Sequence, residues 1–136
     1  MDIRSYIAEN RARFMEEWAS LIRIPSISCQ PSHKADMLRC AERWRELLLE
    51  AGVQHAEVMP SQGNPFVYAE YNPLDVKGKR LEDQGEKIPT VLVYSHYDVM
   101  PVEPLELWNS EPFEPTIRDG RLYARGADDD KGQAMI

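Results

Sequence analysis

A histidine followed two positions later by an aspartate is the first feature of this sequence suited to chemistry. His96 and Asp98 stand at the end of the largely apolar segment TVLVYSHYD. In an extended backbone, residues two apart project from the same face, so the imidazole and the carboxylate can act on one centre. A carboxylate that holds one nitrogen of a histidine orients the other nitrogen toward a metal ion. The pair therefore predicts a metal ligand, His96, oriented by Asp98.

The same spacing also fits a purely structural pair. His96 would then be satisfied by a backbone carbonyl at the end of a strand, and Asp98 would cap the following turn. Residue types and spacing leave both interpretations open.

Three consecutive aspartates, Asp128, Asp129 and Asp130, form the second feature and lie in the segment RGADDDKG. Adjacent carboxylates raise one another's pKa, and a bound cation, a nearby lysine or helix N-terminal amides relieve the repulsion. A cation would explain the run, and so would an acidic helix N-terminus in which Asp128 or Asp129 is the N-cap. An EF-hand calcium loop does not fit, because Gly132 falls at its fifth position rather than its sixth.

Two helices are expected before any strand. Apolar residues at helical spacing predict a helix over residues 2–21, with Asp2 as its N-cap and Pro25 beyond its end. The same pattern predicts a second helix over Lys34–Glu50, closed by Gly52 as its C-cap.

Strands are expected over residues 57–59, 66–71, 89–97, 116–118 and 121–124. Residues 91–94 are apolar without interruption, which predicts a strand covered on both faces. Asp119-Gly120 supplies the turn of a hairpin between the last two strands. The polar stretch of about residues 72–88 predicts an exposed loop. The element order predicts the α/β class with a buried sheet.

Composition excludes several other classes of protein. The 136 residues are the size of one domain, and 16 Lys and Arg against 23 Asp and Glu give a net charge of −7, which argues against a nucleic-acid partner. No apolar run reaches the ~18 residues of a membrane span, and the amino terminus lacks a signal-peptide core. Cys29 and Cys40 have no CxxC spacing and are expected to be reduced thiols. We therefore expect a cytoplasmic protein without a membrane partner.

The segments YSHYDVMPV, LWNSEPFEPTIRDGRLYARG and GADDDKG together resemble the co-catalytic zinc metallopeptidases that include carnosine dipeptidase, aminoacylase, carboxypeptidase G and succinyl-diaminopimelate desuccinylase. The segment ASLIRIPSIS is similar to the opening of this family, so the resemblance spans nearly the whole chain apart from residues 72–88. The pattern of Trp108 and Pro112-Phe113 before the hairpin is most similar to the dipeptidase branch. The resemblance implies an α/β/α sandwich whose central mixed sheet carries two zinc ions.

Position by position, the resemblance assigns the site. His96 would bind one zinc ion, Asp98 would orient His96 as part of the catalytic machinery, and Asp129 would bridge both ions. Asp128 and Asp130 stay open as alternatives for the bridge, because three adjacent aspartates blur the register. The implied cofactor is Zn²⁺, for which Mn²⁺ or Co²⁺ can substitute.

The implied function is hydrolysis of peptide bonds in dipeptides or short peptides by a zinc-activated water. The alternatives are an N-acyl amino acid deacylase and a non-catalytic binding relative on the same scaffold. In the family, a Glu-Glu pair with the general base and a distant histidine ligand come later, and neither His33 nor His55 matches that histidine. Residues 1–136 are therefore expected to be the amino-terminal part of a catalytic domain, inactive by itself, in a protein that forms a homodimer through a further domain.

Overall fold

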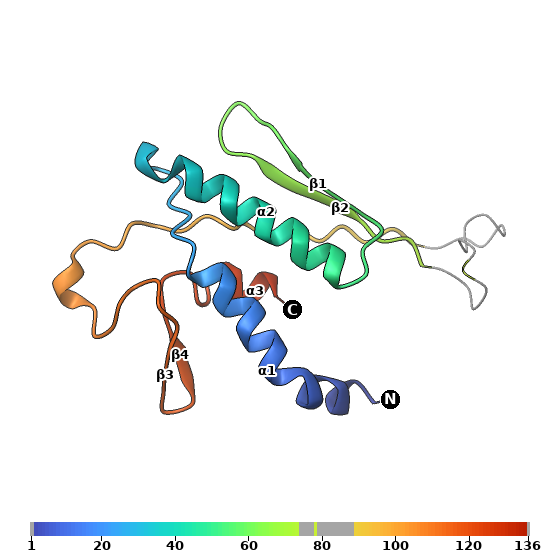
Figure 1. Cartoon of the computed structure of the whole chain (residues 1–136), viewed down its shortest axis with the longest axis horizontal. Helices are drawn as coiled ribbons and strands as arrows, with labels where there is room; N and C mark the ends of the chain where they lie inside the picture. The colour runs from blue at the N-terminus through green and yellow to red at the C-terminus, as the bar shows by residue number, and fades with distance from the viewer. Residues whose placement is uncertain (1, 74–77, 79–88, 136) are drawn as a thin grey trace. The chain divides into compact units, whose positions relative to one another are not determined.

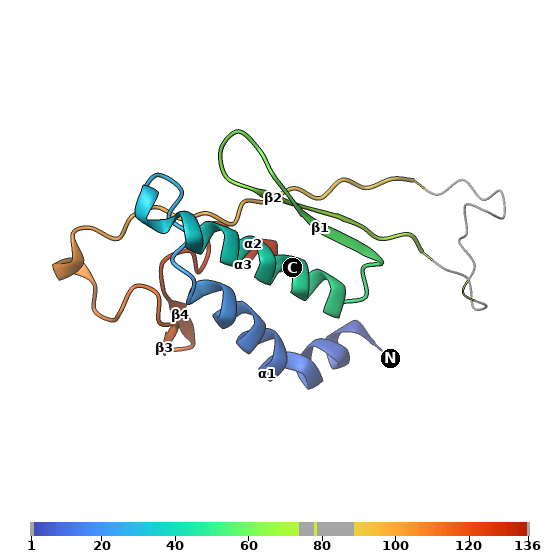
Figure 2. The same cartoon turned by 45° about the horizontal axis from the view of Figure 1, so that its top comes forward.

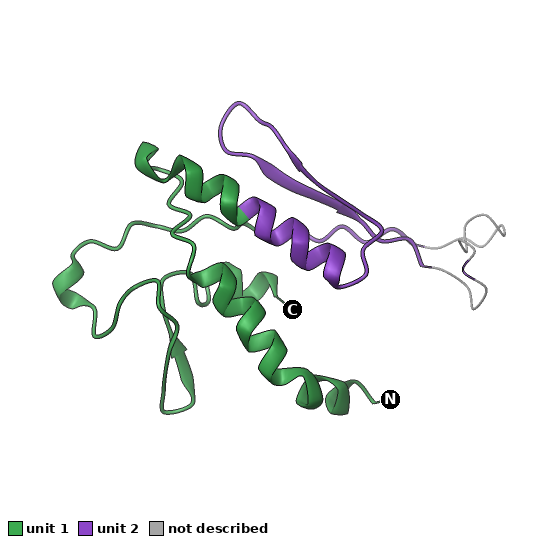
Figure 3. Cartoon of the chain, viewed as in Figure 1, with its two compact units in different colours: residues 1–40, 95–136 green, residues 41–94 purple. Residues whose placement is uncertain are grey.

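The protein is represented by a computed structural model that describes residues 2–73, 78 and 89–135. It divides into two compact units, residues 1–40 together with 95–136, and residues 41–94 (Figure 3). The loop expected over residues 72–88 lies outside the described residues except at positions 72, 73 and 78. The elements in chain order are α1 (Ile3–Ile22), a 3-10 turn (Pro31–His33), α2 (Lys34–Glu50), β1 (His55–Met59), β2 (Phe66–Glu70), a 3-10 turn (Leu105–Leu107), β3 (Thr116–Arg118), β4 (Arg121–Tyr123) and α3 (Lys131–Ala134) (Figure 1).

Helix α1 confirms the first predicted helix to within one residue at each end. Asp2 occupies the N-cap position, but its side chain makes no capping hydrogen bond. The buried residues of α1 gather at its carboxyl end, at Ala19, Leu21 and Ile22. The other end of the helix is exposed, so packing holds α1 mainly through its last two turns.

Helix α2 has the predicted bounds, and its end follows a known local rule. Gly52 has a φ of +99°, which lies in the left-handed region that glycine enters without steric cost. The N–H of Gly52 donates to the carbonyl of Leu49 at 3.0 Å, and the N–H of Val53 donates to that of Leu48 at 3.1 Å. This pair of bonds is the Schellman motif, which satisfies the last carbonyls of the helix.

The second unit contains the antiparallel hairpin of β1 and β2 (Figures 1 and 2). In its register, His55 lies opposite Glu70 and Met59 opposite Phe66. Alternation along β1 buries Ala56, whose carbonyl accepts a hydrogen bond of 3.3 Å from Arg45 Nε of α2. This bond ties the hairpin to the helix that precedes it.

The prediction of a buried strand over residues 89–97 is wrong for the described chain. Val91, Leu92, Val93 and Tyr94 are between 79% and 89% exposed, and no strand within the described ranges pairs with them. A strand buried on both faces needs neighbouring strands for its N–H and C=O groups and a layer of residues over each face. The described residues supply neither, so the apolar run predicts burial that this chain alone does not provide.

The hairpin of β3 and β4 confirms the turn prediction. Asp119 and Gly120 have φ values of 50° and 73°, and a two-residue hairpin turn of type I′ needs positive φ at both positions. Thr116 pairs with Tyr123 and Arg118 with Arg121. Both strands are three residues long, one residue shorter at the end of β4 than expected.

The core of the first unit brings residues 24–28 to residues 97–99. Ile27 and Val99 form a parallel β-bridge, and the N–H of Val99 donates to the carbonyl of Ser26 at 2.9 Å. Ile24, Ile27 and Val99 are each at most 8% exposed. This pairing fixes the backbone on both sides of Asp98. In the described ranges, no helix has both the length and the apolar character needed to cross a membrane.

Candidate metal centre

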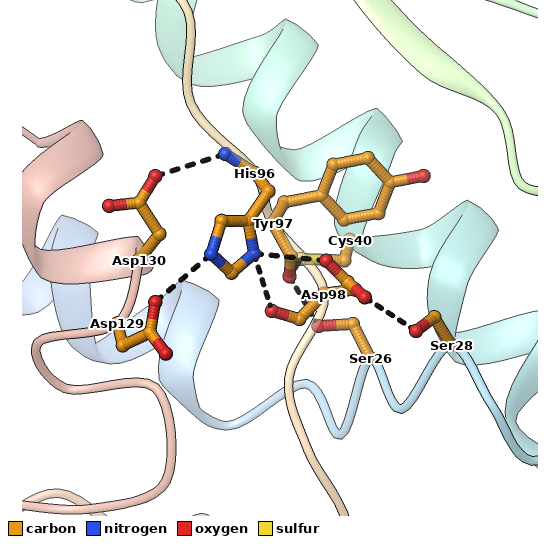
Figure 4. A network of polar contacts seen from close by, with 8 residues as sticks. All are labelled: Ser26, Ser28, Cys40, His96, Tyr97, Asp98, Asp129 and Asp130. Atoms are coloured by element: carbon orange, nitrogen blue, oxygen red, sulfur yellow. Dashed lines mark hydrogen bonds and ion pairs between the residues drawn. The ribbon is translucent and has the colours of Figure 1, made fainter.

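His96 and Asp98 lie in direct contact, as their spacing predicts (Figure 4). Nδ1 of His96 is 3.0 Å from Oδ1 of Asp98 and 3.2 Å from the backbone carbonyl oxygen of Asp98. Both partners are acceptors, so Nδ1 carries the proton in this contact. The other ring nitrogen, Nε2, then turns toward whatever lies on the opposite side of the ring.

Asp129 lies on that opposite side. Its Oδ1 is 3.0 Å from Nε2 of His96, although the two residues are 33 positions apart in the chain. The side chain of Asp129 is 82% exposed, so a metal ion or a substrate can reach it. The structure thus brings together His96, Asp98 and Asp129, the three residues that the sequence singled out.

The three aspartates have different surroundings. Asp130 occupies the N-cap position of α3 without a side-chain capping bond, and its Oδ2 accepts a hydrogen bond of 3.0 Å from the N–H of His96. Asp128 lines a cavity of about 380 Å³ with Trp108 and Tyr123. The alternative in which Asp128 or Asp129 caps this helix is therefore wrong. Among the three, Asp129 is the one whose carboxylate faces Nε2 of His96.

The pKa of His96 reflects two opposing effects. Burial lowers it, but the hydrogen bonds with Asp129 and Asp98 outweigh burial, so the pKa is raised above 6.5. Without a metal ion, a proton on Nε2 is the cation that Asp129 attracts. A metal ion competes with that proton, because only the deprotonated nitrogen can be a ligand.

The donor atoms fit the zinc ion that the resemblance implies. Two ligand atoms about 2.1 Å from a tetrahedral zinc ion lie about 3.4 Å apart. Nε2 of His96 and Oδ1 of Asp129 are 3.0 Å apart, so a small outward movement opens ligand spacing between them. Imidazole nitrogen and carboxylate oxygen are both common zinc ligands, and a histidine ligand is commonly held by a carboxylate as His96 is by Asp98.

The donor set in the described residues is incomplete. No group of three or more His, Cys, Asp and Glu side chains within residues 2–73 and 89–135 has the geometry to hold a metal ion. A catalytic zinc site usually takes three protein ligands. His96 and Asp129 supply two of the three donors that such a site needs.

Two residues that the sequence interpretation left without a role contact the site or its loop. Ser28 donates a hydrogen bond to Oδ2 of Asp98. Lys131 is fully buried, and its Nζ donates to the carbonyls of Leu21 at 2.9 Å and Ile24 at 2.8 Å. Lys131 thereby ties the aspartate segment to the carboxyl end of α1. The sequence shows a lysine directly after three aspartates, and it shows a serine-rich turn. However, the partners of Lys131 and Ser28 are more than 60 positions away in the chain, so local patterns do not predict these contacts.

Comparison with known proteins shows which family this chain is similar to. Residues 92–136 match the profile of peptidase family M20/M25/M40, the range that includes His96, Asp98 and Asp129. A cysteinylglycine-S-conjugate dipeptidase of Corynebacterium striatum is 35% identical over 131 residues, which are 96% of this chain and 26% of that protein. A succinyl-diaminopimelate desuccinylase of Thiobacillus denitrificans is 58% identical over 48 residues, which are 35% of this chain and 12% of that protein. The chain is thus similar to peptidase family M20/M25/M40 in its profile match and to individual members over nearly its whole length.

Two solved structures share the fold of this chain. Human carnosine dipeptidase 1 superposes with a TM-score of 0.77 at 25% identity, over 96% of this chain and 28% of that one. An M20 family metallo-carboxypeptidase from Sulfolobus solfataricus gives a TM-score of 0.71 at 34% identity, over 90% of this chain and 24% of that one. The predicted α/β class is confirmed. This chain spans about a quarter of the length of these two structures.

Proposed function

We propose that the protein carrying this chain is a metal-dependent hydrolase that cleaves the peptide bond of dipeptides or short peptides. The observation that carries the proposal is the 3.0 Å approach of Nε2 of His96 to Oδ1 of Asp129, with Asp98 behind the ring. The similarity to a dipeptidase over 96% of the chain supports dipeptides as the substrate class.

In this proposal each residue has a distinct task. His96 and Asp129 hold metal, Asp129 as the bridge between two ions, and Asp98 keeps the proton on Nδ1 so that Nε2 offers its lone pair. When held by these residues, zinc would supply Lewis-acid chemistry, namely a water of lowered pKa and positive charge next to the scissile carbonyl. The negative charge of Asp129 offsets part of the repulsion between two dications. Zn²⁺ is the proposed metal, and Mn²⁺ or Co²⁺ are substitutes.

A second candidate is an N-acyl amino acid deacylase. A local identity of 58% over 48 residues links this chain to a protein whose name denotes removal of a succinyl group. Both reactions cleave an amide bond, so the same metal-holding residues serve either one. A binding relative that holds the ligand without cleaving it uses the scaffold as well.

The proposed partners and location of the protein rest on its net charge and its cysteines. The net charge of −7 disfavours nucleic acid, and a peptide or an N-acyl amino acid is the proposed substrate. Both cysteines are free thiols, which supports a cytoplasmic location. A homodimer formed through a domain outside residues 1–136 stays a prediction from the family.

The test is hydrolysis of a dipeptide panel by the full-length protein, beside N-acetyl and N-succinyl amino acids. We expect activity that chelation with EDTA abolishes and that Zn²⁺ or Mn²⁺ restores. Asp129→Asn should lower kcat/KM by more than about 100-fold, beyond the usual cost of losing a residue that only orients a ligand. Asp119→Asn is the matched control, because Asp119 lies in an exposed hairpin turn where asparagine is tolerated.

Three results would decide against parts of the proposal. Full activity of Asp129→Asn would exclude Asp129 from the metal centre. Cleavage of the N-acyl amino acids with no cleavage of dipeptides would favour the deacylase. Saturable dipeptide binding by the zinc-loaded protein without any turnover would favour the binding relative.

A further inference from the structure

Both carboxylate oxygens of Asp98 are engaged, and from different segments of the chain. Oδ1 lies 3.0 Å from Nδ1 of His96, and Oδ2 accepts the hydroxyl hydrogen of Ser28, which is 70 positions earlier in the sequence (Figure 4). A carboxylate held at one oxygen can still rotate about its side-chain torsions. Held at both oxygens, its plane is fixed relative to the imidazole ring.

Ser28 is itself held by a buried pairing of two chain segments. Ser26 is 0% exposed, its Oγ donates to the carbonyl of Tyr97 at 2.7 Å, and its own carbonyl accepts from the N–H of Val99 at 2.9 Å. These bonds lie on either side of Asp98 along the chain. The hydroxyl of Ser28 therefore approaches Asp98 from a segment whose position relative to residues 97–99 is set by the core.

We propose that Ser28 is a positioning residue, which fixes the carboxylate of Asp98 so that His96 presents Nε2 to the metal ion. The inference rests on the proposed function, because it gives Ser28 a purpose only if His96 is a ligand. The hydroxyl of Ser28 contacts the carboxylate of Asp98, and Ser28 is not proposed as a ligand. It acts through Asp98 alone.

The surroundings of Asp98 indicate what its carboxylate would do if the hydroxyl of Ser28 were removed. The side chain of Asp98 is 38% exposed, so Oδ2 would turn to water and the carboxylate would gain rotational freedom. Nδ1 of His96 would keep its second acceptor, the carbonyl of Asp98 at 3.2 Å. The loss is therefore partial, and it should be at the lower end of the 10–100-fold range known for residues that orient a ligand.

The experiment measures Zn²⁺ affinity of the full-length protein by competition with a chromophoric chelator. Ser28→Ala should weaken Zn²⁺ binding by about 10-fold. In a protein that already carries Asp98→Ala, the same substitution should change the affinity by less than about twofold, because the residue through which Ser28 acts is gone. Ser32→Ala is the control, because Ser32 is an exposed serine nearby in the chain.

A second pair of variants guards against loss of folding. Thr keeps the hydroxyl of Ser28, and Val has the shape of Thr without it. Ser28→Thr should retain the Zn²⁺ affinity, and Ser28→Val should lose it to the same degree as Ser28→Ala. In the zinc-loaded protein, the Nδ1 proton of His96 should exchange with water faster in Ser28→Val than in Ser28→Thr, as followed by NMR.

The outcomes separate this proposal from the proposed function. Equal Zn²⁺ affinity in Ser28→Thr and Ser28→Val would overturn the role of Ser28 while leaving the metal centre intact. Equal losses from Ser28→Ala with and without Asp98 would also overturn it, because Ser28 would then act by another route. If His96→Ala binds Zn²⁺ as tightly as the wild type, His96 is not a ligand, and the role of Ser28 fails together with the proposed metal centre.

Discussion

Lys131 offers the sharpest test of how the aspartate segment is held in place. Its side chain is 0% exposed, and Nζ bonds to the carbonyls of Leu21 and Ile24 at 2.9 and 2.8 Å. The carbonyl of Leu21 lies in the last turn of α1 and that of Ile24 just beyond the helix, at the end where a cation is favoured. Removing the ammonium group should therefore loosen the contact between α1 and the segment that carries Asp129.

The magnitude follows from what each substitution removes. Lys131→Met keeps most of the apolar stem and removes two charged hydrogen bonds, at about 1.5–3 kcal/mol each. The two carbonyls keep backbone donors, the N–H of Ile24 for Leu21 and the N–H of Ser26 for Ile24. Because Lys131→Met also removes a buried charge, whose desolvation is unfavourable, part of this cost is offset. We expect Lys131→Met to lower the free energy of unfolding by about 1–3 kcal/mol. Lys131→Ala also removes three methylene groups from the core, which should cost about 2 kcal/mol more.

Stability should also change with pH because of this residue. Burial lowers the pKa of Lys131 below 10.5, so between the folded-state pKa and 10.5 the unfolded chain binds the proton more strongly. The penalty for burying the charge is fully present below the folded-state pKa and is relieved as pH rises toward 10.5. The wild type should therefore gain stability relative to Lys131→Met over this interval.

The assay is urea unfolding of the full-length protein followed by tryptophan fluorescence, since Trp18 lies beside Gly132, next to Lys131. Lys34→Met is the matched control, because Lys34 is exposed and its replacement should change stability by less than about 0.5 kcal/mol. If both Lys131 variants are as stable as the wild type, or if Lys131→Met is more stable, the buried ammonium group is not an anchor and the reasoning is refuted.

Two further predictions concern the same unit. Cys29 is exposed, whereas Cys40 is buried and desolvation raises its pKa. A thiol reagent such as DTNB should therefore modify Cys29 first and leave Cys40 unreacted until the protein unfolds. Equal reaction rates of the two thiols would contradict the burial of Cys40. A Cβ on Gly132 would lie 2.0 Å from the carbonyl oxygen of Ala127, so Gly132→Ala should lower the free energy of unfolding by about 3 kcal/mol or more. A Cβ on Gly63 would have no neighbour closer than 3.9 Å, so Gly63→Ala should lower it by less than about 1 kcal/mol. Similar urea midpoints for the two variants would contradict this packing.

Sequence patterns predicted the elements whose signals are local. The spacing of apolar residues and Gly52 placed α2 at its observed bounds, and Asp119-Gly120 placed the β3–β4 turn. The contact between His96 and Asp98 was predictable for the same reason, because two positions in an extended backbone fix which side chains share a face. In each case the interactions that decide the structure lie within a few residues of one another.

Tertiary structure decided what depends on residues far apart in the chain. Three adjacent aspartates look alike in sequence, and only the fold shows that Asp129 faces Nε2 of His96 while Asp130 binds its backbone. The same holds for Ser28, 70 positions from Asp98, and for Lys131, 110 positions from Leu21. The apolar run at 91–94 is a case in which the local pattern predicted burial that the described chain does not have. Hydrophobicity indicates that a segment is suited to burial, but only neighbouring segments can cover it. Which side chains contact one another depends on which segments pack together in the fold, and the local propensity of a segment does not determine its packing partners.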